Sequence, residues 1–308
     1  MLRHFLKTLF AGFLSLFVLI TITFFLIYAI PGGPFSHSDD KLTPRYVLDR
    51  INERYGLDKP VHIQYINYLK RLVQGDLGIS YTKLNTTVNE IVAQGFPVSA
   101  RVGSVAVIWA VFMGVTLGIL SAIYKNTFID WFCRVFATIG VSVPGFVIAV
   151  FLLYFFAVKL GLFPTYGLNS LKGYVLPVAA LSFMPIAYIS RLTRSNMLET
   201  MEQDYIRTAR AKGVSEISVV LKHALRNSIN PIVAYIGPLI AALLTGSFVT
   251  ERLFVIPGIG RFFVMGITDR DYTVILGMTI FFGGLLILCN IVMDMVYAII
   301  DPRIKFQK

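Results

Sequence analysis

Six long runs without a charged residue most constrain what this chain can fold into. They cover residues 8–38, 102–124, 135–158, 173–190, 227–250 and 272–293. A helix needs about 20 apolar residues to cross a bilayer, so each run has room for one span. The fourth run is the shortest and contains Pro177 and Pro185, which spanning helices tolerate where neighbouring helices satisfy the freed carbonyls. The pattern predicts an all-α integral membrane protein with six transmembrane helices.

The composition agrees with a lipid-facing surface. Of the 308 residues 56% are hydrophobic and only 15% are charged, whereas a soluble domain carries about 25% charged residues. The formal net charge is +11, but the basic residues are not clustered with base-stacking aromatics, so we expect no nucleic-acid partner. The excess of basic residues is better explained by anionic lipid and by the positive-inside bias of membrane proteins.

The basic residues also predict an orientation. They concentrate in the loop 191–232 and at the two ends of the chain, whereas the loops 159–172 and 251–271 carry few. The basic residues concerned are Arg3, Lys7, Arg191, Arg194, Arg207, Arg210, Lys212, Lys222, Arg226, Arg303, Lys305 and Lys308. Six spans place both termini on one side, and the positive-inside rule makes that side cytoplasmic.

Four segments are expected along the chain. Arg3 and Lys7 precede the first run as in a secretory signal, but its apolar core is longer than the usual ~7–15 residues, so we expect a retained helix. The segments are a first transmembrane helix within 1–30, an extracytoplasmic helical segment 31–98, a five-helix core 99–300 with the loop 191–232, and a tail 301–308.

The outer segment 31–98 is expected to be helical. Pro31-Gly32-Gly33-Pro34 ends the first span, and Thr43-Pro44 then starts a helix that stops at Gly56. A second, amphipathic helix is expected over 61–73. This segment is either a small cap over the spans or a docking surface for a soluble delivery partner, and the two readings are compatible.

A third outer helix is predicted from a capping box. Thr87 is followed three residues later by Glu90, and Gly95-Phe96-Pro97 is expected to end the helix.

Catalytic and nucleotide-binding motifs are missing from the sequence. It contains no G-x-x-x-x-G-K-[ST], no H-E-x-x-H and no G-x-S-x-G. Cys133 and Cys289 are expected to be packing residues. The histidines, scattered over termini and loops, are His4, His37, His62 and His223.

Charge within the spans is also scarce. Asp294 is the one acid inside the late apolar stretch. We expect it to lie at the membrane interface and to pair there with basic residues of the tail such as Arg303. Transporters driven by protons or sodium usually keep ionisable groups at mid-membrane. The scarcity of such groups indicates that a partner supplies the energy.

The loop 191–232 is expected to hold a short surface helix. Thr200 with Gln203 forms a capping-box pattern at its start, and Gly213 suits a left-handed position at its end. Ile206, Ala209 and Val214 can make an apolar contact. Ser215 then restarts a helix that runs until Pro231. Such a pair of helices is suited to transmit force from a docked protein, although a basic loop at the lipid headgroups is an equal alternative.

Residues 204–213 read D-Y-I-R-T-A-R-A-K-G. This segment resembles the membrane subunits of binding-protein-dependent ABC importers, specifically their oligopeptide/dipeptide permease branch. The general family motif, E-A-A-x-x-x-G, is matched only at Ala209 and Gly213, because Arg207 and Thr208 replace its first two residues. The peptide branch typically has the form found here, and it also commonly has H-A-L-R-N, as at 223–227.

The resemblance extends along nearly the whole chain. The other matching segments are 29–34, 56–60 with Gln64-Tyr65, 75–78, 191–194 with 197–199, 257–261, 270–272 and 301–303.

The resemblance implies a non-enzymatic permease subunit with a MetI-like fold in a bacterial or archaeal inner membrane. It implies half of a pathway for oligopeptides or dipeptides, a second homologous permease, two ATPases that hold ATP and Mg, and an outer solute-binding protein. This chain itself would bind no cofactor. The implied ATPase-coupling residues are Asp204, Tyr205, Arg207, Thr208, Ala209, Arg210, Lys212 and Gly213. A nickel or glutathione importer of the same branch is the alternative, and a secondary transporter fits less well.

Two smaller patterns have alternative readings. Gly114 and Gly118 form a G-x-x-x-G pair, which permits close helix contact with a partner subunit or within the subunit. Pro257-Gly-Ile-Gly260 is a turn-rich outer loop that either touches the substrate or simply connects two elements.

Overall fold

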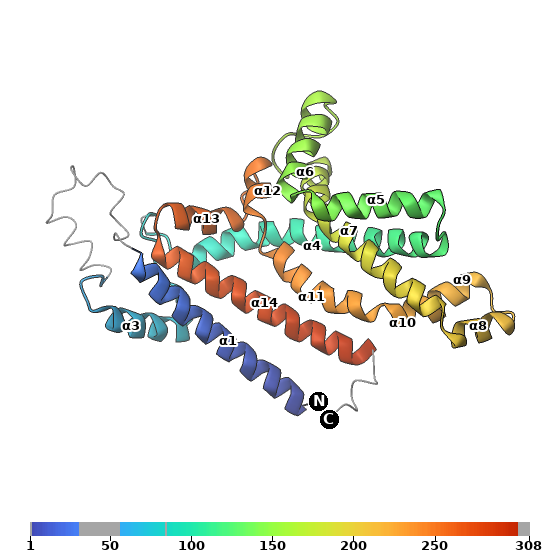
Figure 1. Ribbon diagram of the computed structural model, residues 1–308. Helices are drawn as coiled ribbons and strands as arrows, with labels where there is room; N and C mark the ends of the chain where they lie inside the picture. Colours follow the sequence, from blue (N-terminus) through green and yellow to red (C-terminus); the bar gives the residue numbers. More distant parts are fainter. Residues whose placement is uncertain (1, 31–55, 84, 301–308) are drawn as a thin grey trace. The chain divides into compact units, whose positions relative to one another are not determined.

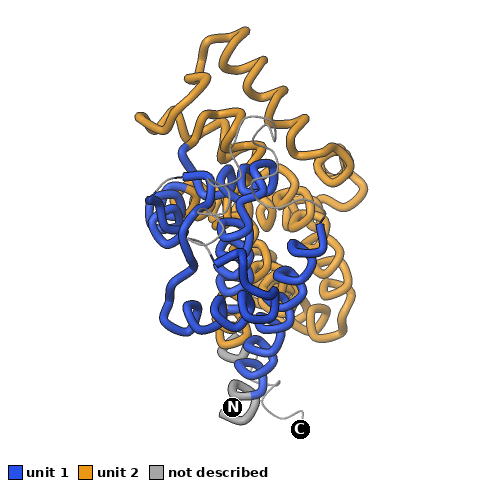
Figure 2. Tube along the Cα trace, turned by 90° about the vertical axis from the view of Figure 1, so that its left-hand side faces the viewer, with its two compact units in different colours: residues 1–98, 257–287 blue, residues 99–256, 288–308 orange. Residues whose placement is uncertain are grey.

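The computed structural model describes residues 2–30, 56–83 and 85–300. In this part of the chain the elements are helices, with one isolated β-bridge between Ile79 and Thr87 (Figure 1). The chain forms two compact units, each built from two separate stretches of sequence (Figure 2). The first contains residues 1–98 and 257–287, and the second contains 99–256 and 288–308. The prediction of an all-α protein is confirmed.

The first unit is built on α1 (Leu2–Ala29), α3 (Val61–Val73), α13 (Gly260–Thr268) and the first part of α14 (Tyr272–Ile300). Phe24 of α1 stacks on Tyr28 with 4.5 Å between ring centroids and also contacts Tyr65 of α3. The hydroxyl of Tyr28 donates to Oε1 of Gln64 at 2.6 Å. The amphipathic helix expected over 61–73 is therefore confirmed, and its tyrosine face packs on α1.

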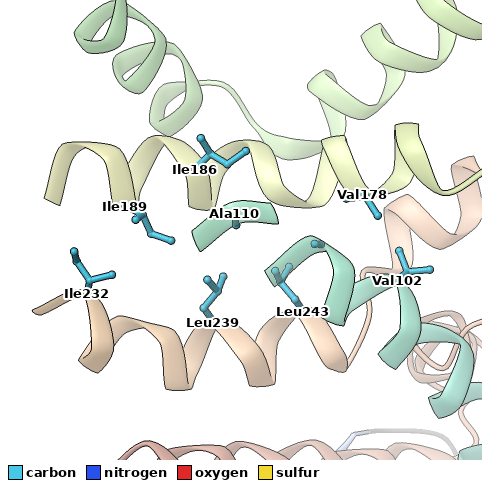
Figure 3. Packing of buried hydrophobic residues seen from close by; sticks show 9 residues of the cluster. Val102, Ala110, Val178, Ile186, Ile189, Ile232, Leu239 and Leu243 are labelled. Carbon is cyan, nitrogen blue, oxygen red and sulfur yellow. The ribbon is translucent and has the colours of Figure 1, made fainter. Parts of the chain in front are cut away.

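The second unit has α7 (Leu171–Met201) at its centre. Its other helices include most of α4 (Val88–Ile123), α5 (Phe128–Ser142), α6 (Gly145–Leu152), α11 (Asn230–Leu244) and α12 (Phe248–Leu253). Side chains of α7 and α11 face each other across a core to which α4 contributes Val102 and Ala110 (Figure 3). The weakest expected span, 173–190, is thus a continuous helix that includes Pro177 and Pro185.

Five described helices are long and apolar enough to cross a membrane. The third expected span, 135–158, is not one straight helix, because α5 and the helical stretch 145–159 meet at an angle of 108°. Pro144 explains the break: it has no backbone N–H, and it holds the preceding Val143 in an extended conformation (φ −88°, ψ 127°). The count reaches six if this bent pair is one span.

The third outer helix begins as predicted but does not end where predicted. The backbone N–H of Thr87 donates to the Glu90 carboxylate at 3.0 Å, and the Glu90 N–H donates to Oγ1 of Thr87 at 3.2 Å. The expected end at 95–97 is wrong, because α4 continues from Val88 to Ile123 with Pro97 inside it. The helix passes through Pro97, as spanning helices can where neighbouring groups satisfy the freed carbonyl.

Other expectations lie outside the described residues. These are the helix that starts at Thr43-Pro44 and the pairing of Asp294 with Arg303.

Glycines let α4 and α5 approach α7 closely. A Cβ added at Gly114 would lie 2.7 Å from Cβ of Ile189, and one at Gly118 would lie 2.7 Å from the Ser190 carbonyl oxygen and also collide with Thr193. On α5, a Cβ at Gly140 would collide with the Cβ of Ala187. The G-x-x-x-G pair thus makes a contact within this chain, of the small-residue type that packs helices in membranes.

Replacing Gly118 with valine is therefore expected to destabilise the fold by about 1–3 kcal/mol, because the added atoms overlap the α7 backbone. Gly284→Val is the matched control, since an added Cβ there meets nothing within 4 Å. Thermal unfolding in one detergent measures both. Equal midpoints for the two variants would contradict the close packing of α4 on α7.

Candidate functional site

A short surface helix, α8 (Asp204–Ala211), follows α7 and is anchored by one apolar face. Ile206 and Ala209 are buried against residues of α4, α7 and the helix that follows α8. The buried residues of this cluster are Ala122, Met197, Ile206, Ala209, Val219, Val220 and Ala224. The prediction that Ile206 and Ala209 make an apolar contact is confirmed.

A Schellman motif ends α8. The N–H of Val214 donates to the Ala209 carbonyl at 3.2 Å, and the N–H of Gly213 donates to the Arg210 carbonyl at 2.9 Å. Gly213 has φ +77°, the left-handed conformation that glycine adopts without cost. The predicted role of Gly213 as the helix stop is confirmed.

The chain continues from this stop as a nearly unbroken helical stretch. Ser215 precedes α9 (Glu216–Ser218), and the stretch runs on as a π-helix (Val219–Leu225) and α10 (Arg226–Ser228). The stretch ends at Ser228, close to the expected end before Pro231, and Pro231 itself lies in the first turn of α11, where a missing N–H costs nothing. The guanidinium of Arg210 holds the Glu216 carboxylate through two bonds of 2.8 and 3.2 Å, which ties α8 to α9.

The opposite face of α8 is exposed and mostly charged. Of the eight residues that the family resemblance singled out, only Ala209 faces inward, and the other seven are exposed. Arg207 lies 3.7 Å from Asp204, and the Asn227 amide donates to the Tyr205 hydroxyl at 3.1 Å. The residues therefore form one continuous surface around a helix that the core holds from behind.

The start of α8 differs from the prediction. The expected capping box of Thr200 with Gln203 is wrong, because Thr200 is buried in the last turn of α7 and Gln203 makes no capping bond to α8. The Gln203 amide instead donates to the Glu199 carbonyl. Burial of Met197 and Thr200 extends α7 to Met201, so that only a short turn separates the two helices.

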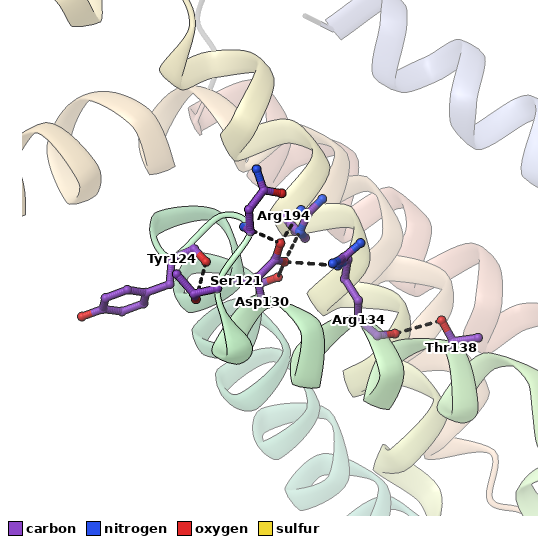
Figure 4. A network of polar contacts seen from close by, with 8 residues as sticks. Ser121, Tyr124, Asp130, Arg134, Thr138 and Arg194 are labelled. Carbon is purple, nitrogen blue, oxygen red and sulfur yellow. Dashed lines mark hydrogen bonds and ion pairs between the residues drawn. The ribbon is translucent and has the colours of Figure 1, made fainter.

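A buried carboxylate near α8 was missed at the level of sequence. Asp130 is fully buried at the start of α5 and accepts a bond of 2.6 Å from Ser121 Oγ and one of 3.0 Å from the Asn126 N–H (Figure 4). Arg194 of α7 donates to it from Nε at 2.7 Å and from Nη2 at 2.9 Å. In the sequence, Arg194 stands out only as a basic residue of the loop 191–232 and as part of the matching segment 191–194. The available signal was an acid between two uncharged runs, in the short stretch from Lys125 to Arg134.

Among the described residues two more acids are buried, one in each unit. In the second unit, Ser99 donates to Glu251 at 2.6 Å. In the first unit, Asp271 accepts bonds from Ser80 Oγ at 2.5 Å and from the Tyr81 N–H at 2.9 Å. Within the turn 257–260 Ile259 is buried in the core of the first unit.

The fold and its surface helix define a class: an all-helical, multi-pass membrane subunit that presents a charged helix beside its spans. Among solved structures, the inward-facing MetNI methionine ABC transporter resembles it with a TM-score of 0.58 at 17% identity, covering 68% of this chain and 96% of that one. An amino acid ABC transporter resembles it with a TM-score of 0.51 at 14% identity, covering 70% and 94% of the two chains. These likenesses concern the fold alone.

Sequence comparison identifies the family. The model for the binding-protein-dependent transport system inner membrane component matches residues 114–306, and the model for its N-terminal part matches residues 1–103. This chain belongs to that family. It is a multi-pass inner membrane protein and a non-catalytic permease component, and membership implies ATPase and binding-protein partners.

Curated relatives match over full length. The dipeptide transport system permease protein DppB of Bacillus subtilis is 43% identical, covering 100% of this chain and 99% of the relative. The oligopeptide transport system permease protein OppB of Salmonella typhimurium is 42% identical, covering 99% of this chain and 100% of the relative.

Replacing Gly213 with valine is expected to loosen the end of α8. An added Cβ meets nothing within 4 Å, so the only penalty is the left-handed backbone, about 1–2 kcal/mol for an ordinary residue. Such a penalty raises the open fraction about 5- to 30-fold. The rate of tryptic cleavage after Arg207, Arg210 and Lys212 in detergent should rise accordingly. Gly213→Asn is the control, because asparagine tolerates this conformation. Equal rates for the two variants would argue against the cap.

Proposed function

We propose that this chain forms half of the membrane pathway of an ATP-driven importer for dipeptides or oligopeptides, which a solute-binding protein delivers. The proposal of a peptide substrate is supported by relatives named for dipeptide and oligopeptide transport, which match end to end at more than 40% identity. A second, homologous permease subunit would complete the pathway, and two cytoplasmic ATPases would hold ATP and Mg.

The geometry of α8 carries the proposal that this helix receives the ATPase. Its apolar face is fully buried at Ile206, whereas Arg207 next to it is largely exposed. One face of this eight-residue helix therefore packs on the permease core, and the other face is free for a partner. Closure of the ATPase pair on ATP would move α8, and with it the helices that hold it.

The charges of the chain support an orientation with both termini in the cytoplasm. α8 and its neighbours carry the basic residues that the positive-inside rule assigns to the cytoplasmic side. This arrangement requires the bent pair 128–159 to cross the membrane once, because five spans would leave the termini on opposite sides.

Reversing the charge at Arg207 is expected to detach the ATPase without unfolding the permease. In a mild-detergent purification of the tagged chain, Arg207→Glu should keep the second permease but lose most of the ATPase, and uptake of labelled dipeptide should fall in parallel. Lys125→Gln is the matched control, since Lys125 is an exposed cation that lies outside α8 and pairs only loosely with Glu202, at 3.4 Å.

The purification and the uptake assay test separate parts of the proposal. Recovery of the wild-type chain with neither an ATPase nor a second permease would overturn it as a whole. Full ATPase recovery with Arg207→Glu would overturn the role of α8. Uptake of nickel or glutathione in place of peptide by the wild-type complex would overturn the substrate class.

The orientation is tested with reporters fused to the C-terminus. Fluorescent protein should be bright and alkaline phosphatase inactive there, as at a reporter placed after Gly213. Active phosphatase both after Gly213 and at the C-terminus, with the N-terminus still cytoplasmic, would show that the bent pair 128–159 does not cross the membrane, because the two spans after Gly213 keep these two positions on one side.

A further inference from the structure

The buried Asp130 joins three helices of the second unit at one point. It receives hydrogen bonds from Ser121 near the end of α4, from the turn at Asn126, and from Arg194 on α7, and it belongs to α5 itself (Figure 4). Arg134, one turn further along α5, lies 3.6 Å from the same carboxylate. Each of the two carboxylate oxygens therefore accepts two hydrogen bonds.

This cluster differs in kind from the other ion pairs of the region. The side chain of Asp130 is 0% exposed and that of Arg194 is 21% exposed, whereas both side chains of the Lys125–Glu202 pair are about half exposed or more. Exposed pairs hold helices together weakly, but removing one partner of a buried pair leaves an uncompensated charge. The bidentate geometry also fixes the orientation of Arg194, because its Nε and Nη2 each donate to a different oxygen of the carboxylate.

The parts of α4 and α7 that meet at Asp130 also contribute to the apolar cluster on which α8 packs. Ser121 binds Asp130, and the next residue, Ala122, lies in the apolar cluster beneath Ile206. Arg194 binds Asp130, and one turn later Met197, fully buried, lies in the same cluster. On α4 the residue that binds Asp130 is directly followed by a residue of the apolar cluster that holds α8. On α7 the two corresponding residues lie one turn apart.

From this continuity we propose that Asp130 and Arg194 are positioning residues, which lock α4, α5 and α7 into a single platform beneath α8. A movement imposed on α8 is then passed to α5 and to the bent segment after Pro144, and is not absorbed by sliding of α7. This inference rests on the proposed function, because it assigns the pair a role in passing on the motion that an ATPase imposes.

The decisive variant removes the charges of Asp130 and Arg194 but keeps side chains of similar size that can still form some of the hydrogen bonds. Asp130→Asn combined with Arg194→Gln leaves no unpaired buried charge, so it is expected to fold and to assemble with its partners. In proteoliposomes, ATP hydrolysis per assembled complex should stay near the wild-type rate, while peptide uptake per ATP hydrolysed should fall about tenfold. Glu202→Gln is the matched control, because it breaks an exposed ion pair between the same α4–α5 turn and the end of α7.

The ratio of uptake to hydrolysis separates the possible results. A lower yield of complex with a normal ratio would show that the pair only stabilises the fold, and would overturn the inference. A wild-type ratio at normal yield would overturn it as well. A wild-type complex that neither hydrolyses ATP nor takes up peptide would instead overturn the proposed function. The single variants Asp130→Asn and Arg194→Gln should assemble less well than the double variant, since each leaves its partner unmatched.

Discussion

The second compact unit depends on how closely α4 and α5 approach α7. In a bilayer, burying apolar side chains gives helices little reason to associate, because lipid tails are equally apolar, so close packing and polar contacts must hold them. Gly114, Gly118 and Gly140 provide the close packing along the helices. Asp130 with Arg194 provides the polar contact at one end. Both devices meet on α7, which makes this helix the element on which the rest of the unit is aligned.

The surface helix α8 uses this alignment. It is too short to be stable alone, since isolated helices of fewer than about 12 residues are marginal in water. Its position depends on Ile206 and Ala209 in a cluster that the ends of α4 and α7 supply, and on a glycine cap that stops it cleanly. An anchored inner face leaves the charged outer face exposed, which is what the proposed docking of an ATPase requires.

Much of this could be predicted from sequence, for reasons that are local. Uncharged runs located the apolar helices, the Thr87–Glu90 box located the start of α4, and Gly213 located the end of α8. The failures were tertiary. Pro144 broke a helix that Pro97, Pro177 and Pro185 did not, and no local pattern distinguishes them. Asp130 and Arg194 are far apart in the sequence, and only the packing of α5 on α7 brings them together.

The claim that α8 and its platform move as one body is tested most directly by a distance. Spin labels at Thr208 on α8 and at Phe128 on α5 are both exposed, and Cys133 and Cys289 would be replaced first. The distance distribution between the labels is measured in the assembled complex without nucleotide and with ATP trapped, while labels on the two ATPases report their closure. An unchanged distribution while the ATPases close is the result expected. A shift of the Thr208–Phe128 distance on closure would contradict a rigid platform.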